Sequence, residues 1–291
     1  MKTTLEAYAK INLYLDIVGK RENGYHDIKG IMHRIALSDS VTVELEHAQS
    51  TEITLTCSQA GIPTDQKNIA YRAAQTYLDR YVSEPYRVNI GIDKRIPAAG
   101  GLAGGSTDGA AVLRAMHGML GGIDPSELIS DSAALGADVP FCMTDGAMIT
   151  EGIGEILTPC ATLPECAILI CNTGEGVSTP LAYAKLDEIY GNFEHASFDE
   201  GRFSRLTEGL EKGDLALISE GMYNIFESAV LPECPLAAEA KSIMLRHGAV
   251  GAMMSGSGST IFGLYHDASD AQTAYGMLSA LGYVTHILKN S

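Results

Sequence analysis

The sequence has few basic residues, with 20 Lys and Arg against 36 Asp and Glu in 291 residues. The resulting net charge of −16 repels nucleic acid and anionic membranes over most of the surface, so we expect neither as a partner. An anionic ligand would have to be held by a local device, such as a group of backbone N–H donors.

Other features are missing as well. No apolar run reaches the ~18 residues of a membrane span, and polar residues interrupt the N-terminal stretch where a secretory signal would need an apolar segment. The six cysteines include no C-x-x-C pair and have no histidine at zinc-like spacing, which favours reduced thiols over a metal or disulfide framework. We therefore predict a cytoplasmic protein.

At ~150 residues per domain, the length predicts about two domains. We place the boundary near residue 155, so that the domains are 1–155 and 156–291. No short internal repeat or low-complexity tract divides the chain further.

Residues 5–17 alternate between apolar and polar side chains, which predicts a half-buried strand. Lys10 and Asn12 stand on its polar face, and a strand places such a pair on one side, ~7 Å apart. A lysine in this position is most often only solvated, so Lys10 by itself says little.

A glycine-rich loop follows the strand that ends near Ile92 and leads into a helix from about Asp108 to Leu120. Its glycines let backbone N–H groups approach an anion, and the helix N-terminus adds favourable charge, so the loop predicts phosphate binding. A flexible surface turn is the alternative. The pattern is not that of a P-loop, a Rossmann dinucleotide site or a protein kinase. The loop comprises Pro97, Ala98, Ala99, Gly100, Gly101, Leu102, Ala103, Gly104, Gly105, Ser106 and Thr107.

A second helix is predicted from Asp124 to Leu135, ending at Gly136. Pro140 then disfavours helical geometry at Val139, so we expect Asp138 in a short extended turn.

The second half has a different pattern. We predict strands at 166–171 and 283–288 and two more around 249–265, with helices at 179–190, 203–230, 235–247 and 269–281. This β-α-β-β-α-β order is typical of a ferredoxin-like sandwich. The loop Ser255–Ser259 lies between the two central strands and could be a simple hairpin loop.

Five motifs occur in order along the chain: A-K-I-N-L at 9–13, N-G-Y-H at 23–26, the glycine loop, L-G-A-D-V-P-F at 135–141 and M-S-G-S-G at 254–258. Together they resemble the GHMP kinase superfamily. Within it they are similar to the branch that acts on a cytidine diphosphate sugar alcohol in non-mevalonate isoprenoid biosynthesis. The two glycine-containing loops are common to the superfamily, whereas the other three motifs make the match specific.

The resemblance implies an α+β fold with an N-terminal domain like ribosomal protein S5 domain 2 and a C-terminal ferredoxin-like domain. It implies ATP and Mg²⁺ as cofactors and transfer of the γ-phosphoryl group to the 2-hydroxyl of the methylerythritol moiety. Lys10 and Asp138 match the catalytic pair, and residues 97–107 match the ATP-phosphate loop. Asn12, Tyr25 and His26 match the substrate side, and Thr179 and Tyr183 the stretch that contacts the cytidine. The Mg²⁺ ligands stay open, with Ser106 and Thr107 as candidates.

Two positions depart from the family pattern. Ala103 stands where many members have glycine, which is tolerable only if its φ is negative. Ser259 replaces a common proline. The rival functions are a GHMP kinase for mevalonate or homoserine, a nucleotide-binding regulatory protein without catalysis, and a structural interaction module.

Overall fold

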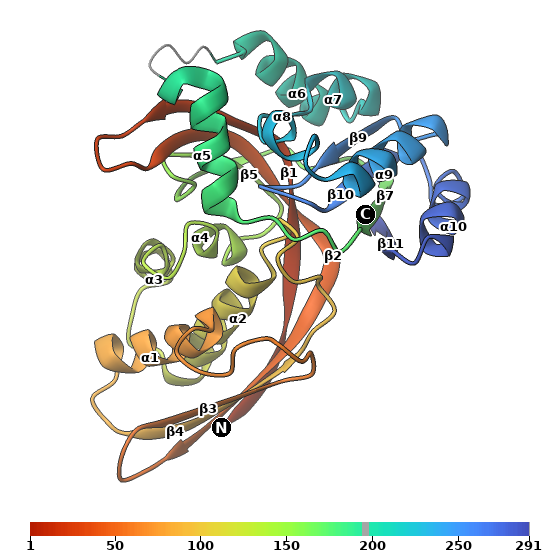
Figure 1. Cartoon of the computed structure of the whole chain (residues 1–291). Helices are drawn as coiled ribbons and strands as arrows, with labels where there is room; N and C mark the ends of the chain where they lie inside the picture. The colour runs from red at the N-terminus through yellow and green to blue at the C-terminus, as the bar shows by residue number, and fades with distance from the viewer. Residues whose placement is uncertain (194–197, 291) are drawn as a thin grey trace. The chain divides into compact units, whose positions relative to one another are not determined.

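The computed structural model describes residues 1–193 and 198–290 (Figure 1), which form two compact units. Unit 1 comprises residues 1–9, 37–98 and 103–145, and unit 2 comprises 10–36, 99–102 and 146–291. The long strands β1 (Lys2–Lys20) and β2 (His26–His47) contribute to both units. These units are defined by contacts and are discontinuous in sequence, so the domain boundary near residue 155 stays a prediction.

In unit 1 a sheet with the strand order β3-β4-β2-β1 carries helices whose apolar sides form a common core with it. Strand β4 (Tyr86–Asp93) runs parallel to β3 (Glu52–Cys57) and antiparallel to β2. The helices are α1 (Ile69–Tyr81), α2 (Gly104–Leu120), α3 (Pro125–Ser132) and α4 (Val139–Cys142).

Helix α1 begins after Asn68, whose side-chain oxygen accepts a hydrogen bond from the N–H of Ala70 at 2.9 Å. Helix α2 begins at Gly104, four residues earlier than predicted, and the bond from the N–H of Thr107 to the carbonyl of Ala103 closes its first turn. The last residues of the glycine loop are therefore helical.

The prediction of an extended turn at Asp138 was wrong. Asp138 has φ −83° and ψ −13° and directly precedes α4, in which Pro140 is the second residue. Proline is tolerated in the first turn of a helix because the N–H it lacks would have no partner there. The short helix therefore forms despite the proline.

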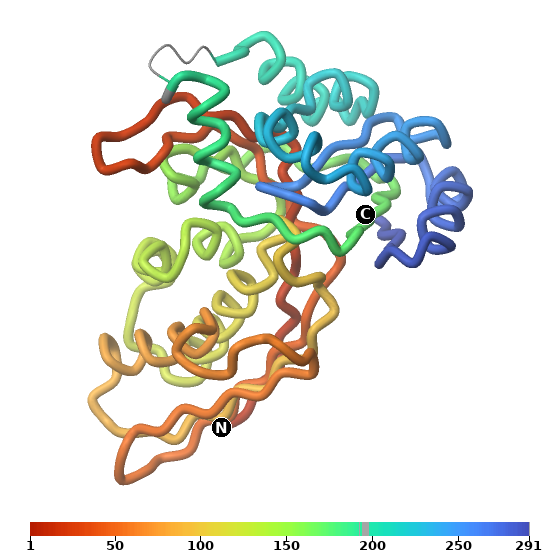
Figure 2. The backbone as a smooth tube through the Cα atoms, viewed as in Figure 1, coloured from red at the N-terminus to blue at the C-terminus, as the bar shows by residue number. Residues whose placement is uncertain are grey.

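The C-terminal part of unit 2 contains a four-stranded sheet with the order β11-β7-β10-β9, and its neighbouring strands are antiparallel. This is the order of a ferredoxin-like sheet, as the sequence predicted. The strands are β7 (Cys166–Asn172), β9 (Gly251–Met254), β10 (Ile261–Tyr265) and β11 (Val284–Asn290). The hairpin of β9 and β10 is traced in blue in Figure 2.

Of the helices in this part, α5 (Thr179–Tyr190), α9 (Pro235–Arg246) and α10 (Gln272–Ala280) lie close to their predicted ranges. The prediction of one helix over 203–230 was wrong. Gly213 ends the first helix with a φ of +66°, Asp214 caps the next, and the range contains four elements. These elements are α6 (Glu200–Lys212), α7 (Leu215–Gly221), the short strand β8 (Tyr223–Asn224) and α8 (Glu227–Val230).

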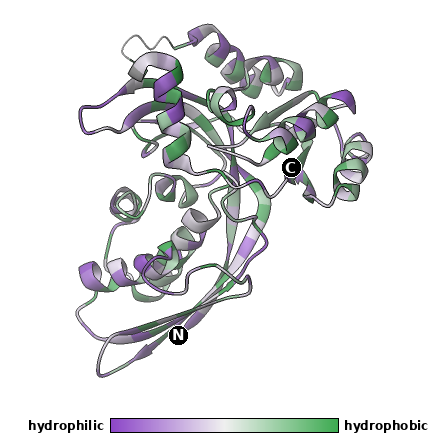
Figure 3. Ribbon diagram, in the orientation of Figure 1, coloured by the Kyte–Doolittle hydropathy of each residue, from purple (hydrophilic) through white to green (hydrophobic). Residues whose placement is uncertain are grey.

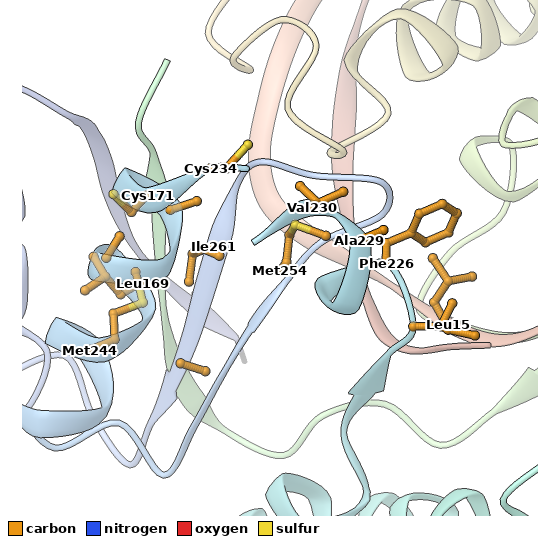
Figure 4. Packing of buried hydrophobic residues seen from close by; sticks show 14 of the residues in the cluster. Leu15, Leu169, Cys171, Phe226, Ala229, Val230, Cys234, Met244, Met254 and Ile261 are labelled. Carbon is orange, nitrogen blue, oxygen red and sulfur yellow. The ribbon is translucent and has the colours of Figure 1, made fainter. Parts of the chain in front are cut away.

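The core of unit 2 joins this sheet to α8 and α9, where Leu169, Met254 and Ile261 of the sheet belong to the same buried cluster as Val230 and Met244 (Figure 4). Hydrophobic and hydrophilic residues form bands along the long strand β2 (Figure 3). Strand β8 pairs with the unit 2 half of β1, and β5 (Ala147–Glu151) pairs with β2 and with β6 (Ile156–Cys160).

Within residues 1–193 and 198–290, no helix is both long and apolar enough to cross a bilayer.

Asp16 on β1 is a buried carboxyl group, with 5% of its surface exposed. Burial raises its pKa from 3.8 to about 6, because the ionised form loses its water, and the hydrogen bond from the Ile17 N–H offsets this only in part. Asp199 and Arg202 of the α6 region act on it with opposite signs. Asp16 thus stays protonated up to a higher pH in the folded protein than in the unfolded chain.

A group whose pKa is raised by folding stabilises the protein below its unfolded pKa, and this contribution is lost as the pH rises through the folded pKa. We expect the free energy of unfolding to lose up to about 3 kcal/mol from Asp16 between about pH 4 and pH 7. Denaturant titrations of Asp16→Asn should show a correspondingly flatter pH profile, whereas the exposed control Asp93→Asn should keep the wild-type profile. An unchanged slope in Asp16→Asn would contradict this assignment.

Candidate active site

Lys10 is almost completely buried, with 3% of its surface exposed. Its ammonium group donates hydrogen bonds to the side-chain oxygen of Asn12 at 2.6 Å and to the carbonyl of Gly101 at 2.8 Å. The alternation along β1 correctly placed Lys10 and Asn12 on one side of the strand. A buried ammonium group is costly unless such bonds satisfy it, so Lys10 is not an ordinary solvated lysine.

The central part of the glycine loop, residues 99–102, belongs to unit 2 and lies against the loop between β9 and β10. The hydroxyl of Ser255 donates to the carbonyl of Gly101 at 3.0 Å, and the N–H of Thr260 donates to the carbonyl of Gly100 at 3.3 Å. Gly101 has a φ of +76°, and a Cβ there would lie 2.0 Å from the carbonyl oxygen of Ser255. Only glycine fits this approach of two backbones.

The second loop, residues 255–260, is held mainly by buried polar groups. The carbonyl of Gly256 accepts a bond from the side chain of Asn224 at 2.8 Å, and Gly256 itself has a φ of +57°. The hydroxyl of Ser259 donates to the carbonyl of Glu175. A proline at position 259 has no hydroxyl and could not make that bond. The serine that departs from the family pattern therefore adds a hydrogen bond to Glu175.

The final part of the loop belongs to unit 1. Alanine at position 103 would be free of strain only with a negative φ. Ala103 has a φ of +60°, so this condition is not met. The left-handed conformation costs a residue with a Cβ about 1–2 kcal/mol, and Ala99 has it too, with a φ of +52°. Thr107 is buried and donates to the carbonyl of Tyr8 at 2.7 Å, whereas Ser106 is partly exposed.

A buried ion cluster in unit 1 was not found from the sequence. Lys94 donates to Asp39 and, at 2.9 Å, to Asp108 in the second turn of α2. The other oxygen of Asp39 accepts bonds from the N–H groups of Arg95 and Ile96, at 2.6 and 2.8 Å. Burial raises the pKa of Asp108. Asp39 thus fixes the backbone just before the glycine loop. Because Asp39 is far from the loop in the sequence, no sequence motif indicated this role.

Asp138 belongs to unit 1, where it is partly exposed and its carbonyl accepts the first hydrogen bond of α4 from the N–H of Cys142 at 3.1 Å. The pairing of Asp138 with Lys10 stays a prediction.

Two of the predicted substrate residues of unit 2, His26 and Tyr183, belong to an aromatic cluster. The rings of His26 and Tyr183 stack, with centroids 4.8 Å apart and planes inclined by 22°, and Phe226 meets Tyr183 edge to face. The Nε2 atom of His26 lies 2.7 Å from a carboxylate oxygen of Asp187, and Lys20 donates to the other oxygen at 2.7 Å.

Burial alone would raise the pKa of Asp187, but the bonds from Lys20 and His26 outweigh it and lower that pKa. The sequence did not single out Lys20 or Asp187.

The other predicted substrate residues lie outside this cluster. The hydroxyl of Thr179 forms a hydrogen bond with the hydroxyl of Ser257 at 2.8 Å, and Tyr25 is 59% exposed.

Two family sequence models match the chain, GHMP kinases N terminal domain over residues 68–146 and GHMP kinases C terminal over 206–284. A protein of Alkaliphilus metalliredigens named 4-diphosphocytidyl-2-C-methyl-D-erythritol kinase is 42% identical over 98% of this chain and 96% of its own length. One of the same name from Lachnoclostridium phytofermentans is 39% identical over 94% and 91%.

Among solved structures, a 4-(cytidine 5'-diphospho)-2C-methyl-D-erythritol kinase is similar, with a TM-score of 0.79, 30% identity and coverage of 99% of this chain and 100% of that one. A homoserine kinase from Cytophaga hutchinsonii has a TM-score of 0.75 at 18% identity and covers 100% and 94%. The second likeness shows the fold alone.

Proposed function

We infer the function from the premise that the chain belongs to the GHMP kinase family, within which its near full-length relatives are 4-diphosphocytidyl-2-C-methyl-D-erythritol kinases. The protein is a small-molecule kinase that phosphorylates this cytidine diphosphate sugar alcohol with ATP as the donor. The product carries the new phosphate on the 2-hydroxyl. The homoserine kinase and a similar mevalonate kinase structure are 18% and 16% identical to the chain, which shows the shared fold and does not favour mevalonate or homoserine as the acceptor.

The observation that carries the catalytic proposal is the buried ammonium group of Lys10, fixed by Asn12 and by the carbonyl of Gly101. A positive charge in a water-poor site stabilises developing negative charge strongly, and a group held in advance needs no reorganisation during the reaction. We assign Lys10 to orienting the acceptor oxygen and stabilising its charge. A regulatory protein that had lost catalysis would be expected to lack Lys10 or Asp138, and both are present.

The glycine loop is assigned to the phosphates of ATP. Its residues at the start of α2 offer backbone N–H groups and the positive end of the helix dipole, which suits an anion in a protein with a net charge of −16. Mg²⁺ bound to the phosphates would neutralise part of their charge. Of the two candidate hydroxyls, that of Ser106 fits this ion better, because Thr107 is buried and bonded to Tyr8. The described residues hold no group of three or more His, Cys, Asp or Glu that could bind a metal ion.

Asp138 is assigned as the proton acceptor. A bond forms between the 2-oxygen of the substrate and the γ-phosphorus, the bond from that phosphorus to the bridging oxygen of ADP breaks, and the hydroxyl proton passes to the carboxylate. Phosphoryl transfer has a loose transition state, so the proton can leave late and a carboxylate is a sufficient base.

The cytidine end is assigned to the aromatic cluster of His26 and Tyr183. One face of the Tyr183 ring already stacks on His26, and the contact between His26 and Asp187 orients the imidazole. Because His26 is buried and Tyr183 is partly exposed, the pyrimidine is assigned to the Tyr183 ring. Thr179 and Asn12 are the other proposed substrate contacts. Tyr25 is proposed as well, but it is exposed and few neighbouring groups hold it in place.

The function is tested by ADP release with a panel of alcohols at saturating ATP and Mg²⁺. We expect turnover with 4-diphosphocytidyl-2-C-methyl-D-erythritol and none above background with mevalonate, homoserine or methylerythritol without the nucleotide. Turnover of mevalonate or homoserine at a comparable kcat/KM would instead favour the corresponding rival kinase.

The cytidine assignment is tested by Tyr183→Ala. Loss of one base–aromatic stack costs ~1 to 3 kcal/mol, which raises the KM of the cytidylyl substrate by roughly 5- to 150-fold. The KM of ATP should barely change. Tyr183→Phe keeps the ring and is the matched control, with both KM values near wild type. An equal rise of both KM values in Tyr183→Ala, or of neither, would remove Tyr183 from the cytidine site.

The base assignment is tested by Asp138→Asn, which keeps the side-chain volume but cannot take the proton. We expect kcat to fall at least about a hundredfold, the typical contribution of a general base. Binding of ATP, measured by calorimetry, should stay near wild type because the phosphate loop is unchanged. Asp93→Asn, an exposed carboxylate of the same unit, should keep its kcat. A folded Asp138→Asn that retains most of its kcat, with chemistry shown to limit the rate, would leave Asp138 as a structural residue.

A further inference from the structure

Asn224 is a buried amide with an unusually complete set of hydrogen bonds. It is 2% exposed, and its side-chain NH₂ group donates to the carbonyls of Met254 and Gly256, both at 2.8 Å. Its side-chain oxygen accepts a bond from the N–H of Phe226 at 3.0 Å. Asn224 is also one of the two residues of β8, where it pairs with Leu15 of β1, the strand that carries Lys10.

The two carbonyls that Asn224 holds lie on either side of Ser255. They therefore fix the turn in which the hydroxyl of Ser255 points to the carbonyl of Gly101. The turn itself allows no side chain, because a Cβ on Gly256 would lie 3.0 Å from the carbonyl oxygen of Gly101 and 3.1 Å from the ammonium nitrogen of Lys10. A displacement of this turn would thus change the surroundings of both the Gly101 carbonyl and the Lys10 ammonium group.

The carbonyl of Gly101 is where these contacts meet. It accepts one hydrogen bond from Ser255 at 3.0 Å and one from the ammonium group of Lys10 at 2.8 Å. If the turn moves, this carbonyl loses a donor and a close neighbour, and Lys10 loses the fixed position of one of its acceptors. Buried polar networks are sensitive to such changes because each lost partner leaves a group unsatisfied.

We propose that Asn224 is a positioning residue for Lys10, acting through the turn at Ser255 and Gly256 and the carbonyl of Gly101. Its effect on catalysis rests on the proposed function of Lys10, whereas its effect on the position of Lys10 does not. Every residue of this path belongs to unit 2.

Asn224→Asp is the informative variant, because it keeps the shape of the side chain. It removes both N–H donors and puts a carboxylate oxygen opposite two carbonyl oxygens, so the turn is pushed away. Asn290→Asp is the matched control. Asn290 also donates to two carbonyls, those of Leu163 at 2.8 Å and Pro164 at 3.1 Å, but it lies in β11 and contacts neither loop.

The position of Lys10 is measured by brief acetylation of the folded protein with acetic anhydride, followed by mass spectrometry. The exposed Lys2, 63% exposed, is the internal reference. Buried Lys10 should react slowly in the wild type, and Asn224→Asp should raise the ratio of Lys10 to Lys2 labelling at least about threefold by loosening its surroundings. Asn290→Asp should leave the ratio unchanged. An unchanged ratio in folded Asn224→Asp overturns the proposal.

Turnover gives the second readout. We expect kcat of Asn224→Asp to fall at least about tenfold per folded molecule, which corresponds to ~1.4 kcal/mol of barrier, with the KM of the cytidylyl substrate near wild type. A purely structural role would lower the melting temperature and leave kcat per folded molecule unchanged. Increased labelling of Lys10 with an unchanged kcat would uphold the positioning role and overturn the catalytic role proposed for Lys10.

If Asn224→Asp does not fold, Ser255→Ala tests whether the turn positions Lys10. It removes only the bond from Ser255 to the carbonyl of Gly101 and leaves the backbone of the turn in place. Labelling of Lys10 should rise relative to Lys2, and a wild-type ratio would show that the turn does not position Lys10.

Discussion

The buried ammonium group of Lys10 is the charge on which the arrangement of unit 2 depends. It lies in a strand with almost no access to water, so its cost has to be offset by fixed acceptors, which are the side chain of Asn12 and the carbonyl of Gly101. That carbonyl is available only because Gly101 adopts a left-handed conformation against the backbone of Ser255. The need to satisfy one buried charge thus brings together β1, the glycine loop and the β9–β10 loop.

Local binding groups, rather than the overall charge, explain how a protein with a net charge of −16 can act on highly anionic substrates. Its proposed phosphate contacts are backbone N–H groups and a helix N-terminus rather than a basic surface. Of the two buried lysines near the glycine loop, Lys10 is fixed by hydrogen bonds and Lys94 by ion pairs with two aspartates, and two left-handed alanines add strain to the loop. The rest of the fold has to maintain this strained, preorganised loop, which is the reason that a residue such as Asn224, outside every sequence motif, acquires importance.

Much of the fold could be predicted from the sequence because periodicity and local signals are short-range. The strand over 5–17 and the β-α-β-β-α-β order of the second half were predicted correctly, but the strand is not half-buried, because the side chains of residues 9–17 are buried on both of its faces. The errors arose where local rules compete. Pro140 was taken to disfavour helical geometry at Val139, although it stands in the first turn of α4. The range 203–230, predicted as one helix, contains a helix end at Gly213 and the two-residue strand β8. Neither feature has a periodicity long enough to detect.

The sequence by itself determined the family, and with it the residues of the candidate site, because five short motifs in a fixed order are improbable by chance. It also placed Lys10 beside Asn12, since neighbours two apart on a strand always share a side. Only the tertiary structure decided which distant groups bond these buried polar groups: Gly101 for Lys10, Asp39 for Lys94, Asp187 for His26 and Asn224 for the turn at Ser255. These partners are separated from the groups they bind by up to 161 residues, and a hydrogen bond of 3 Å between such segments follows from chain packing, which no local pattern encodes.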